Sequence, residues 1–505
     1  MSNSLQRAAT VILILLAALL LAQAAFSLSW PIAHDEAPLL YEALLMQNGQ
    51  TPYKDFFDFQ MPGSYLFYYL LGLLSNFSPL RLRILDLAIL AAVLLITYFA
   101  MRRFGKPSAL AAPILFALKY LEGGPALSLQ REYLILIFIS LSIWIGVDAP
   151  RTFFKRLSLG LLYGLVFTLK PHAALGLVPF LLFDIADLRE RRELTLQTLA
   201  RQIVLPASIG FIIPISLIAL YLAITHSLFP FISIALNYWR LYSQINGEMA
   251  VTPSAERTAY LLNQLPRLGG SGFWLIPAAF GIYLNKNRQT YLLASLALLY
   301  ALYPALTGQF FPYHYIPFLY TIILIASIVL QVESSKLKVA TFNLQPSTLL
   351  SVTLLLVTLA TIRPSQTFLR QLAGKSIATS SERSAAIADF LADNLEPGDQ
   401  VQPLDWTGGA LLAMLQTRAP LATSYVFDFY FYHHVSNPYI QSLRADFMNQ
   451  LQESKPRFIV EVTSIDKPWV SGEDTSRDFP ELRAYLGESY SVEVKRKDYV
   501  IYERR

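Results

Sequence analysis

The stretch AATVILILLAALLLAQAAFSL, residues 8–28, decides the fold class of this chain. A helix needs roughly 20 mostly apolar residues to cross a bilayer, and this run supplies them without one charged side chain. Ala22-Gln23-Ala24 resembles a signal-peptide cleavage site, but the run is longer than the roughly 7–15 apolar residues of a signal core. We therefore predict an uncleaved first transmembrane helix.

The whole chain, like its first predicted helix, is rich in apolar residues and poor in charged ones. Of 505 residues, 54% are hydrophobic and 15% are charged, and the mean hydropathy is +0.43. A soluble domain carries about 25% charged residues. The composition therefore excludes soluble, disordered and fibrous proteins and predicts a polytopic α-helical membrane protein. The absence of cysteine excludes disulfides, thiolate catalysis and Cys-ligated metal centres.

Ten further apolar stretches bring the predicted number of transmembrane helices to about eleven. They lie near residues 80–101, 107–121, 132–147, 157–170, 173–187, 203–226, 271–285, 289–306, 311–331 and 347–362. A shorter apolar segment, 61–75, is interpreted as interfacial or re-entrant. A twelfth span there would place the later basic loops on the wrong side of the membrane.

Basic residues set the predicted orientation. Cytoplasmic loops are enriched in Lys and Arg, and with eleven spans the loop cations fall on one side: Arg7, Arg102, Arg103, Lys106, Arg151, Lys155, Arg156, Arg189, Arg191, Arg192, Arg201, Lys286, Arg288, Lys336 and Lys338. The net charge of +5 thus indicates basic cytoplasmic loops and not a nucleic-acid partner. We expect a multi-pass protein of the bacterial inner membrane with an extracytoplasmic C-terminus.

The chain is predicted to have two domains. Residues 1–362 form the transmembrane domain, and residues 363–505, of soluble composition, form a small extracytoplasmic α/β domain. In the second domain we expect a helix at Ser381–Asn394, a strand at Arg457–Val462 and a terminal hairpin of Ser489–Arg496 with Tyr499–Arg504. The aromatic run Tyr425, Phe427, Phe429, Tyr430, Phe431 and Tyr432 beside His433-His434 favours core packing over a sugar-stacking platform.

Acids, cations and histidines converge on the predicted outer face. The loop after the first span carries Asp35, Glu36, Glu42, Asp55 and Asp58. Other outer segments add Glu122, Arg131, Glu132, Lys170, His172 and His314. Lys170 ends an apolar span on the side where basic residues are disfavoured. A cation at such a position tends to have a defined partner, and a phosphate is a natural one.

Several of these residues resemble a known family. His34-Asp35-Glu36, followed by Gly49-x-x-Pro52-Tyr53-x-Asp55 and Pro62, resembles the first outer loop of the GT-C membrane glycosyltransferases. Within that superfamily it is similar to the branch of protein O-mannosyltransferases, aminoarabinose transferases and RgtA-to-D-like bacterial enzymes. Arg131-Glu132 and His314-Tyr315 also resemble family positions. The likeness covers about residues 8–330.

The resemblance implies a glycosyltransferase that uses a polyprenyl-phosphate sugar donor and a glycan, lipid or protein acceptor. It implies Asp35 as the base, which takes the acceptor proton, with Glu36 in support. Cations must meet the leaving phosphate, and the candidates are Arg131, Lys170, His172 and His314. Asp55, Asp58, Glu132 and Tyr315 are candidate substrate-binding residues. A divalent metal beside Asp35 and Glu36 stays open, because nothing in the spacing demands it.

The sequence leaves two alternative functions open. A lipid-linked-oligosaccharide flippase or transporter would usually show internal repeats and broken helices at the membrane midplane, and the sequence shows no repeat. An O-antigen-ligase-like enzyme would carry its key residues in a late outer loop, whereas here the acids lie in the first loop. No Gly-rich nucleotide-binding motif is present in a strand–helix context, as expected for a membrane-soluble donor.

Overall fold

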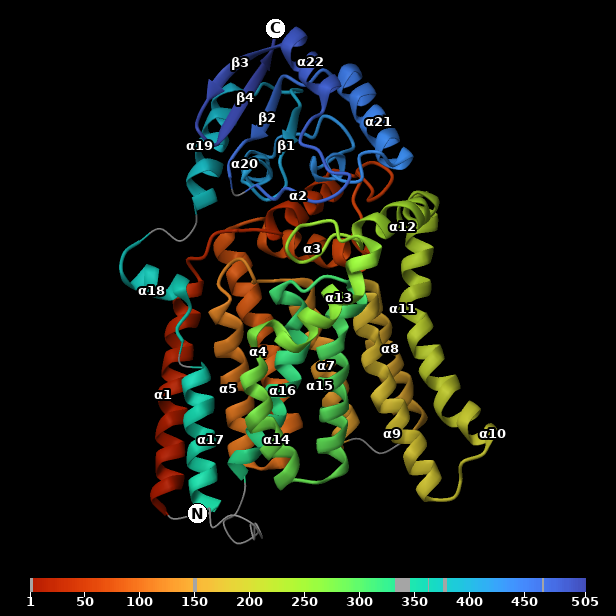
Figure 1. The fold of residues 1–505 in the computed structure, drawn as a ribbon, viewed down its shortest axis with the longest axis vertical. Coiled ribbons are helices and arrows are strands. Elements are labelled where there is room, and N and C mark those ends of the chain that lie inside the picture. The colour runs from red at the N-terminus through yellow and green to blue at the C-terminus, as the bar shows by residue number, and fades with distance from the viewer. Residues whose placement is uncertain (1–2, 149–151, 332–345, 362, 376–378, 466) are drawn as a thin grey trace. The chain divides into compact units, whose positions relative to one another are not determined.

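The computed structural model describes residues 3–148, 152–331, 346–361, 363–375, 379–465 and 467–505 (Figure 1). The chain forms two compact units, and each draws on separate parts of the sequence. Unit 1 comprises residues 1–28, 83–218 and 261–375; unit 2 comprises residues 29–82, 219–260 and 376–505. The linear boundary near residue 362 stays a prediction, and the two units are described separately below.

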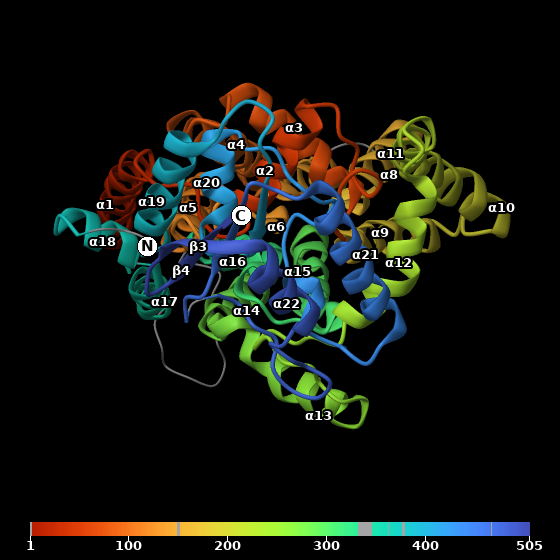
Figure 2. The ribbon, with the colours of Figure 1, turned by 90° about the horizontal axis from the view of Figure 1, so that it is seen from above.

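Among the described residues, every regular element of unit 1 is a helix, because its segments are apolar runs bounded by Pro, Gly and charged residues. In both views α1, α5 and α17 lie side by side (Figure 1 and Figure 2). The α-helices of this unit, including those that continue beyond its limits, are α1 (Asn3–Ser27), α4 (Pro79–Met101), α5 (Lys106–Glu122), α6 (Arg131–Leu134), α7 (Leu136–Asp148), α8 (Phe153–Leu169), α9 (Leu177–Glu190), α10 (Leu196–Thr198), α11 (Leu205–Ile224), α14 (Leu275–Leu284), α15 (Arg288–Thr307), α16 (Ile316–Ser327), α17 (Pro346–Thr361) and α18 (Gln366–Leu372).

Shorter helical turns connect these helices and shape their ends. They are η1 (Arg102–Phe104), η2 (Pro171–Gly176), the π-helical η3 (Leu199–Val204), η4 (Leu265–Gly270), η5 (Gly272–Trp274), η6 (Pro312–Tyr315) and η7 (Ile328–Gln331). Two of them matter for the site: η2 directly follows α8, and η6 directly precedes α16.

Each of the eleven apolar stretches predicted from the sequence contains a helix. Among the described residues, six helices are long and apolar enough to cross a membrane, or seven if the bent pair of α17 and α18 forms one span. The protein is therefore a polytopic membrane protein, while the count of eleven spans stays a prediction. The interfacial or re-entrant segment predicted at 61–75 is the helix α3 (Pro62–Ser75). At about 1.5 Å per residue, it is too short to span.

Unit 2 contains the only sheet of the described chain, with strand order β1-β2-β4-β3. The strands are β1 (Val401–Leu404), β2 (Phe458–Val462), β3 (Tyr490–Lys495) and β4 (Tyr499–Arg504). β1 and β2 pair in parallel, and β4 pairs antiparallel with both β2 and β3. The predicted strand and terminal hairpin are confirmed. β1 was not predicted; it is short and contains Pro403, which an edge strand tolerates.

Unit 2 also contains helices, of which α20 packs against β1 and β2, and α22 packs against β3. They are α2 (Glu36–Gln47), α3, α12 (Leu228–Tyr242), α13 (Ser254–Gln264), α19 (Thr379–Asn394), α20 (Ala410–Thr417), η9 (Phe429–Phe431), α21 (Pro438–Ser454) and α22 (Pro480–Ser489). α19 confirms the predicted helix at Ser381–Asn394. The aromatic run from Tyr425 to Tyr432 is buried, with exposed fractions of 4% or less, so the packing interpretation is confirmed.

The predicted first outer loop is a folded part of unit 2. Its helix α2 is buried from Glu36 to Leu45 and packs against α3 and α20. The Tyr41 hydroxyl donates to the carbonyl of Ala419 at 2.7 Å, and the amide of Phe57 donates to the carbonyl of Ser424 at 2.7 Å. These two contacts join the loop to the C-terminal segment within unit 2.

Candidate functional site

A buried carboxylate in unit 1 gathers most of the cations that the sequence singled out. Glu132 lies in α6 with no exposed surface, and its Oε1 lies 2.8 Å from Lys170 Nζ and 3.5 Å from His314 Nε2. The Tyr303 hydroxyl donates to the same oxygen at 3.3 Å. Arg131 is buried beside Glu132 and adds its charge. We call Arg131, Glu132, Lys170, Tyr303 and His314 the Glu132 cluster.

Proline residues place two members of this cluster. Pro171 disfavours helical geometry at the residue before it. α8 therefore ends at Leu169, and Lys170 takes an extended conformation as its C-cap. Pro312 starts the short helix η6, which carries His314. His314 Nδ1 lies 2.7 Å from the carbonyl oxygen of Gln309. Because a carbonyl only accepts, Nδ1 carries the proton, and Nε2 faces Glu132.

The Glu132 cluster holds fixed cations, one of which is partly exposed. Two cations, Lys170 and Arg131, and the imidazole of His314 lie around one carboxylate. The Lys170 side chain is 18% exposed, so its ammonium is partly accessible from outside the cluster. A fixed group of cations in a water-poor site is what a phosphate leaving group requires.

A largely apolar pocket is lined in part by residues that neighbour members of the Glu132 cluster in the sequence. It lies between α5, η4 and α16 in unit 1 and encloses about 690 Å³, open solvent included. Phe116, Leu127, Ile316 and Leu319 provide apolar walls, and Lys119 and Glu122, paired at 2.8 Å, add charges. Two links join pocket and cluster. Tyr120 in the lining stacks on Tyr133, next to Glu132, and Pro312 and Ile316 flank His314.

The two other predicted residues of unit 1 lie differently. His172 is exposed in η2 and has no contact with Glu132 in the described chain. Tyr315 is buried, and its ring packs against the backbone of Gly269, where a Cβ atom would approach the ring to 2.5 Å. Gly269 has a φ of +59°, so both conformation and space require glycine there.

The first-loop acids lie in unit 2, and three of the five accept hydrogen bonds from neighbouring groups. Glu36 accepts from the amide of Ala33 at 3.2 Å, and Asp55 accepts from the amide of Thr51 at 2.7 Å. Asp58 accepts from the Tyr65 hydroxyl at 2.7 Å and from the Tyr430 hydroxyl at 3.2 Å. Glu42 is fully buried within α2. These contacts hold the loop together.

Asp35 differs from its neighbours because its carboxylate faces a titratable group. It occupies the N-cap position of α2, and its Oδ1 lies 3.0 Å from Nδ1 of His34. The Asp35 side chain is 10% exposed and the His34 side chain 49%. His34 has a φ of +52°, an unusual conformation for a non-glycine residue. A nearly buried carboxylate beside an accessible imidazole is a suitable arrangement for proton transfer.

The structure adds two residues to the site that the sequence analysis missed. Tyr303 and Gln309 contact Glu132 and His314, but both lie in or beside an apolar helix without a motif to mark them. Tyr303 could have been noticed as a tyrosine within an apolar span, because its hydroxyl needs a hydrogen-bond partner when it is buried.

Within the described residues, no group of three or more His, Asp or Glu side chains is placed to hold a metal ion.

Comparison with known proteins identifies solved structures with a similar fold. No protein-family model matches the chain, and no curated protein does. ArnT from Cupriavidus metallidurans is similar in structure. Its structure bound to undecaprenyl phosphate has 12% sequence identity over 97% of both chains, and its apo structure has 13% over 98% of both, each with a TM-score of 0.58. The chain thus has the fold of ArnT, which confirms the fold implied by the resemblance.

Proposed function

We propose that this integral membrane protein is a glycosyltransferase that moves a sugar from a polyprenyl-phosphate donor to an acceptor at the extracytoplasmic membrane face. The observation that carries the proposal is the Glu132 cluster, in which cations are fixed around one buried carboxylate. Residues that flank His314 in the sequence also line an apolar pocket. A phosphate on a long isoprenoid chain needs both kinds of surface. ArnT, with the same fold, has been solved with undecaprenyl phosphate bound.

The Glu132 cluster would act on the donor phosphate. As the bond between the anomeric carbon and the phosphate oxygen breaks, both electrons stay on that oxygen and the phosphate becomes more anionic. Lys170 and Arg131 stabilise this charge because their positions are fixed before the reaction. Glu132 orients Lys170 and carries no bond change itself. The Tyr303 hydroxyl donates to Glu132 in turn.

Asp35 would act on the acceptor. It takes the proton of the acceptor hydroxyl while the acceptor oxygen forms the new bond to the anomeric carbon. His34, at 3.0 Å, orients the carboxylate and is exposed enough to pass the proton to solvent. Glu36, held by the Ala33 amide, supports the turn on which Asp35 lies. Asp55, Asp58 and Tyr315 remain proposals as substrate contacts, and in the structure they have packing roles.

The test is turnover by the purified full chain in lipid nanodiscs. Synthetic polyprenyl-phosphate sugars, labelled in the lipid, would be supplied with membrane extract as a source of acceptor. We expect acceptor-dependent release of polyprenyl phosphate. Vectorial movement of intact donor across sealed vesicles, without cleavage, would contradict the proposal and support the transporter alternative.

A further inference from the structure

Helix α12 of unit 2 carries an exposed apolar stripe. Phe229, Ile232 and Leu236 are 82%, 41% and 73% exposed, and their spacing of three and four residues places them on one face of the helix. Ile234 and Tyr238 are buried on the opposite face. The helix is therefore apolar both where it packs and along part of its exposed side. Such a contiguous surface marks contact with an apolar partner.

The exposed side of α12 also has a polar stripe, which runs beside the apolar one. Ser233, Asn237 and Arg240 are exposed along it. Successive residues of a helix point about 100° apart, so Leu236 and Asn237 face different surroundings. An exposed surface divided lengthwise into apolar and polar stripes is typical of a helix that lies in a membrane interface. One stripe then enters the acyl region, and the other faces water.

The apolar stripe follows directly on the end of a long apolar helix. α11 belongs to a segment long and apolar enough to cross a membrane, and its last part, in unit 2, exposes Leu220 and Ile224 by 56% and 68%. Only residues 225–227 separate α11 from α12. His226 has a φ of +58°, which ends the helical path of α11. Lipid that contacts the end of α11 is therefore within reach of Phe229 at the start of α12.

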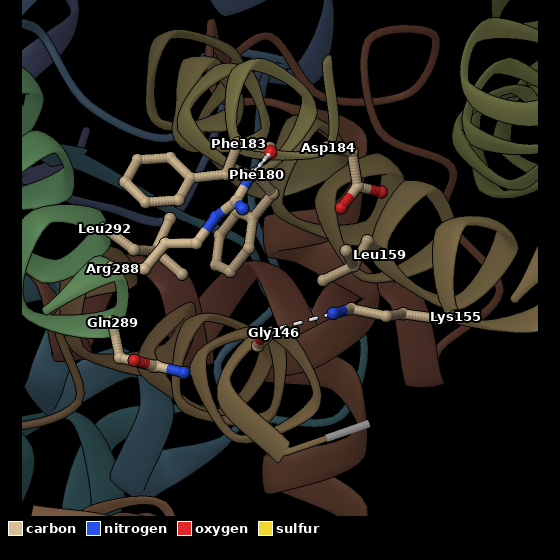
Figure 3. Close-up of a pocket in the computed structure, with 9 residues that line it drawn as sticks. All are labelled: Gly146, Lys155, Leu159, Phe180, Phe183, Asp184, Arg288, Gln289 and Leu292. Atoms are coloured by element: carbon tan, nitrogen blue, oxygen red, sulfur yellow. Dashed lines mark hydrogen bonds between the residues drawn. The ribbon is translucent and has the colours of Figure 1, made fainter. Parts of the chain in front are cut away.

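Unit 1 shows where this chain places charged and apolar residues. Figure 3 shows Lys155, Asp184 and Arg288 around one small pocket, and Lys155 donates to the carbonyl of Gly146 at 3.1 Å. Further along α15, an apolar side chain, Leu298, is 64% exposed. An exposed apolar stripe next to a membrane-spanning helix therefore has the composition of the lipid-facing surface of this protein.

The inner side of α12 holds part of the predicted first outer loop within unit 2. Nε1 of Trp239 donates to the carbonyl of Phe59 at 2.8 Å. The rings of Tyr242 and Phe59 have their centroids 4.3 Å apart. These contacts fasten residues 53–59, which include Asp58, to α12. The position of the helix therefore sets the position of this segment.

We propose that α12 lies in the membrane interface of the leaflet in which α11 ends, with Phe229, Ile232 and Leu236 among the acyl chains of the lipids. The polar stripe faces water, and Arg240 reaches the head groups. Through its inner side, α12 fixes the depth at which residues 53–59 lie relative to the bilayer. The partner is the lipid surface itself, and the contact does not depend on glycosyl transfer.

Nitroxide labels on the full chain in liposomes measure this depth directly. The chain has no cysteine, so Phe229→Cys, Ile232→Cys and Leu236→Cys each give a single label. Oxygen concentrates among acyl chains, and a nickel chelate stays in water. We expect oxygen to relax these labels more than nickel does, as at the lipid-facing reference Leu217→Cys on α11. Asn237→Cys is the matched control, where nickel should dominate. Nickel access at the three stripe positions equal to that at position 237 would overturn the proposal.

A second copy of the chain is the other occupant that these labels can recognise. The stripe labels would then be shielded from both reagents. Their spectra would also broaden through coupling between chains, and dilution with unlabelled protein would remove the broadening. That result would overturn the assignment of this face to lipid.

Added charge tests whether α12 anchors the first loop. Lys54 has a side chain that is 48% exposed, and Lys54→Cys places a label on the loop. We expect a nickel-chelating lipid to relax this label, and to relax it less when Phe229→Asp and Leu236→Asp drive α12 out of the acyl region. Ser233→Asp with Asn237→Asp adds the same charge to the polar stripe and should leave the relaxation unchanged. All four positions are exposed, so no core contact is lost. Equal relaxation in the two double variants would contradict the anchoring.

Discussion

Glu132 shows why single charges in an apolar segment carry information. A carboxylate with no exposed surface is costly to bury unless cations and donors compensate it, and here Lys170, His314 and Tyr303 all contact one oxygen. The sequence analysis selected Arg131, Lys170 and His314, together with His172, as candidate neighbours of a phosphate. The structure brings them together around Glu132, but places His172 at the surface.

At Lys170, stability and function can be separated. Lys170→Met should lower transfer about 10²–10³-fold, because a fixed cation at the leaving phosphate is lost. It should also destabilise the fold by about 3–5 kcal/mol, because Glu132 loses its closest partner. The double variant Lys170→Met with Glu132→Gln should regain stability without regaining transfer. Thermal unfolding and the turnover assay measure the two effects.

The control for Lys170 is Arg370→Gln, which removes an exposed positive charge of α18 outside the cluster. We expect wild-type transfer from it. Recovery of transfer by the double variant would show that Lys170 only balances Glu132, and the phosphate assignment would be wrong.

At Asp35, the prediction concerns proton transfer alone. Asp35→Asn keeps the shape and the hydrogen bond to His34 but cannot accept a proton at neutral pH. We expect a loss of about 10²–10⁴-fold in transfer with donor binding retained, measured on the same purified variant. Glu36→Gln, whose carboxylate caps the turn, should lose much less. The reverse ranking would move the base to Glu36.

At the scale of elements, close helix packing depends on glycines that the sequence analysis did not single out. α8 and α11 approach at Gly160 and Gly164, where a Cβ atom would lie 2.1 Å from the carbonyl oxygen of Ala207 and 2.5 Å from that of Phe211. Small residues four apart let transmembrane helices pack closely. This spacing could have predicted the contact between α8 and α11.

Substitution at this contact should therefore be costly. Gly160→Leu should destabilise the protein by at least about 1–3 kcal/mol, because the added side chain forces the two helices apart. Gly272→Ala is the control, since a Cβ atom there meets nothing within 4 Å. Both are compared by thermal unfolding in detergent. An equal effect of the two variants would contradict the packing argument.

The C-terminal part of unit 2 has a buried histidine that makes its stability depend on pH. Burial, and then the charge of His434, lower the pKa of His433 to about 3. Its Nε2 lies 2.9 Å from the Tyr238 hydroxyl, and its Nδ1 lies 2.9 Å from Nδ1 of His434. An unfolded histidine has a pKa of about 6.5, so between these values the unfolded state binds the extra proton.

The unfolding free energy should therefore fall as the pH drops from about 6.5 toward 3, by up to about 1.4 kcal/mol per pH unit, and be unaffected by His433 above about 6.5. His433→Gln should reduce this slope. Thermal unfolding of the full chain from pH 7.5 to pH 4 gives the measurement. An unchanged slope in the variant would show that other groups control the acid sensitivity.

At the scale of the whole molecule, the sequence predicted the helices better than the contacts. Long apolar runs identify helices because membrane insertion constrains composition directly. β1 escaped detection because four residues with Pro403 resemble a loop. The roles of Asp58 and Glu36 in packing escaped because their partners, such as Tyr430, lie hundreds of residues away or depend on backbone geometry.

Membrane orientation is the prediction that belongs to this scale. A reporter active only in the cytoplasm should be active when fused after Arg192 and inactive when fused after Arg505, because the loop cations lie on one side of the eleven-span arrangement. An active reporter at the C-terminus would place unit 2 and its Asp35 on the cytoplasmic side and contradict an extracytoplasmic reaction.

The central claim is that the Glu132 cluster binds the phosphate of a polyprenyl-phosphate donor. The most direct measurement is a cryo-electron-microscopy structure of the full chain in nanodiscs with polyprenyl phosphate added. We predict density for the phosphate within hydrogen-bonding distance of Lys170 Nζ and of the Arg131 guanidinium, with Glu132 still paired to Lys170. A well-ordered polyprenyl phosphate bound elsewhere, with the Glu132 cluster unchanged and closed to it, would contradict the claim.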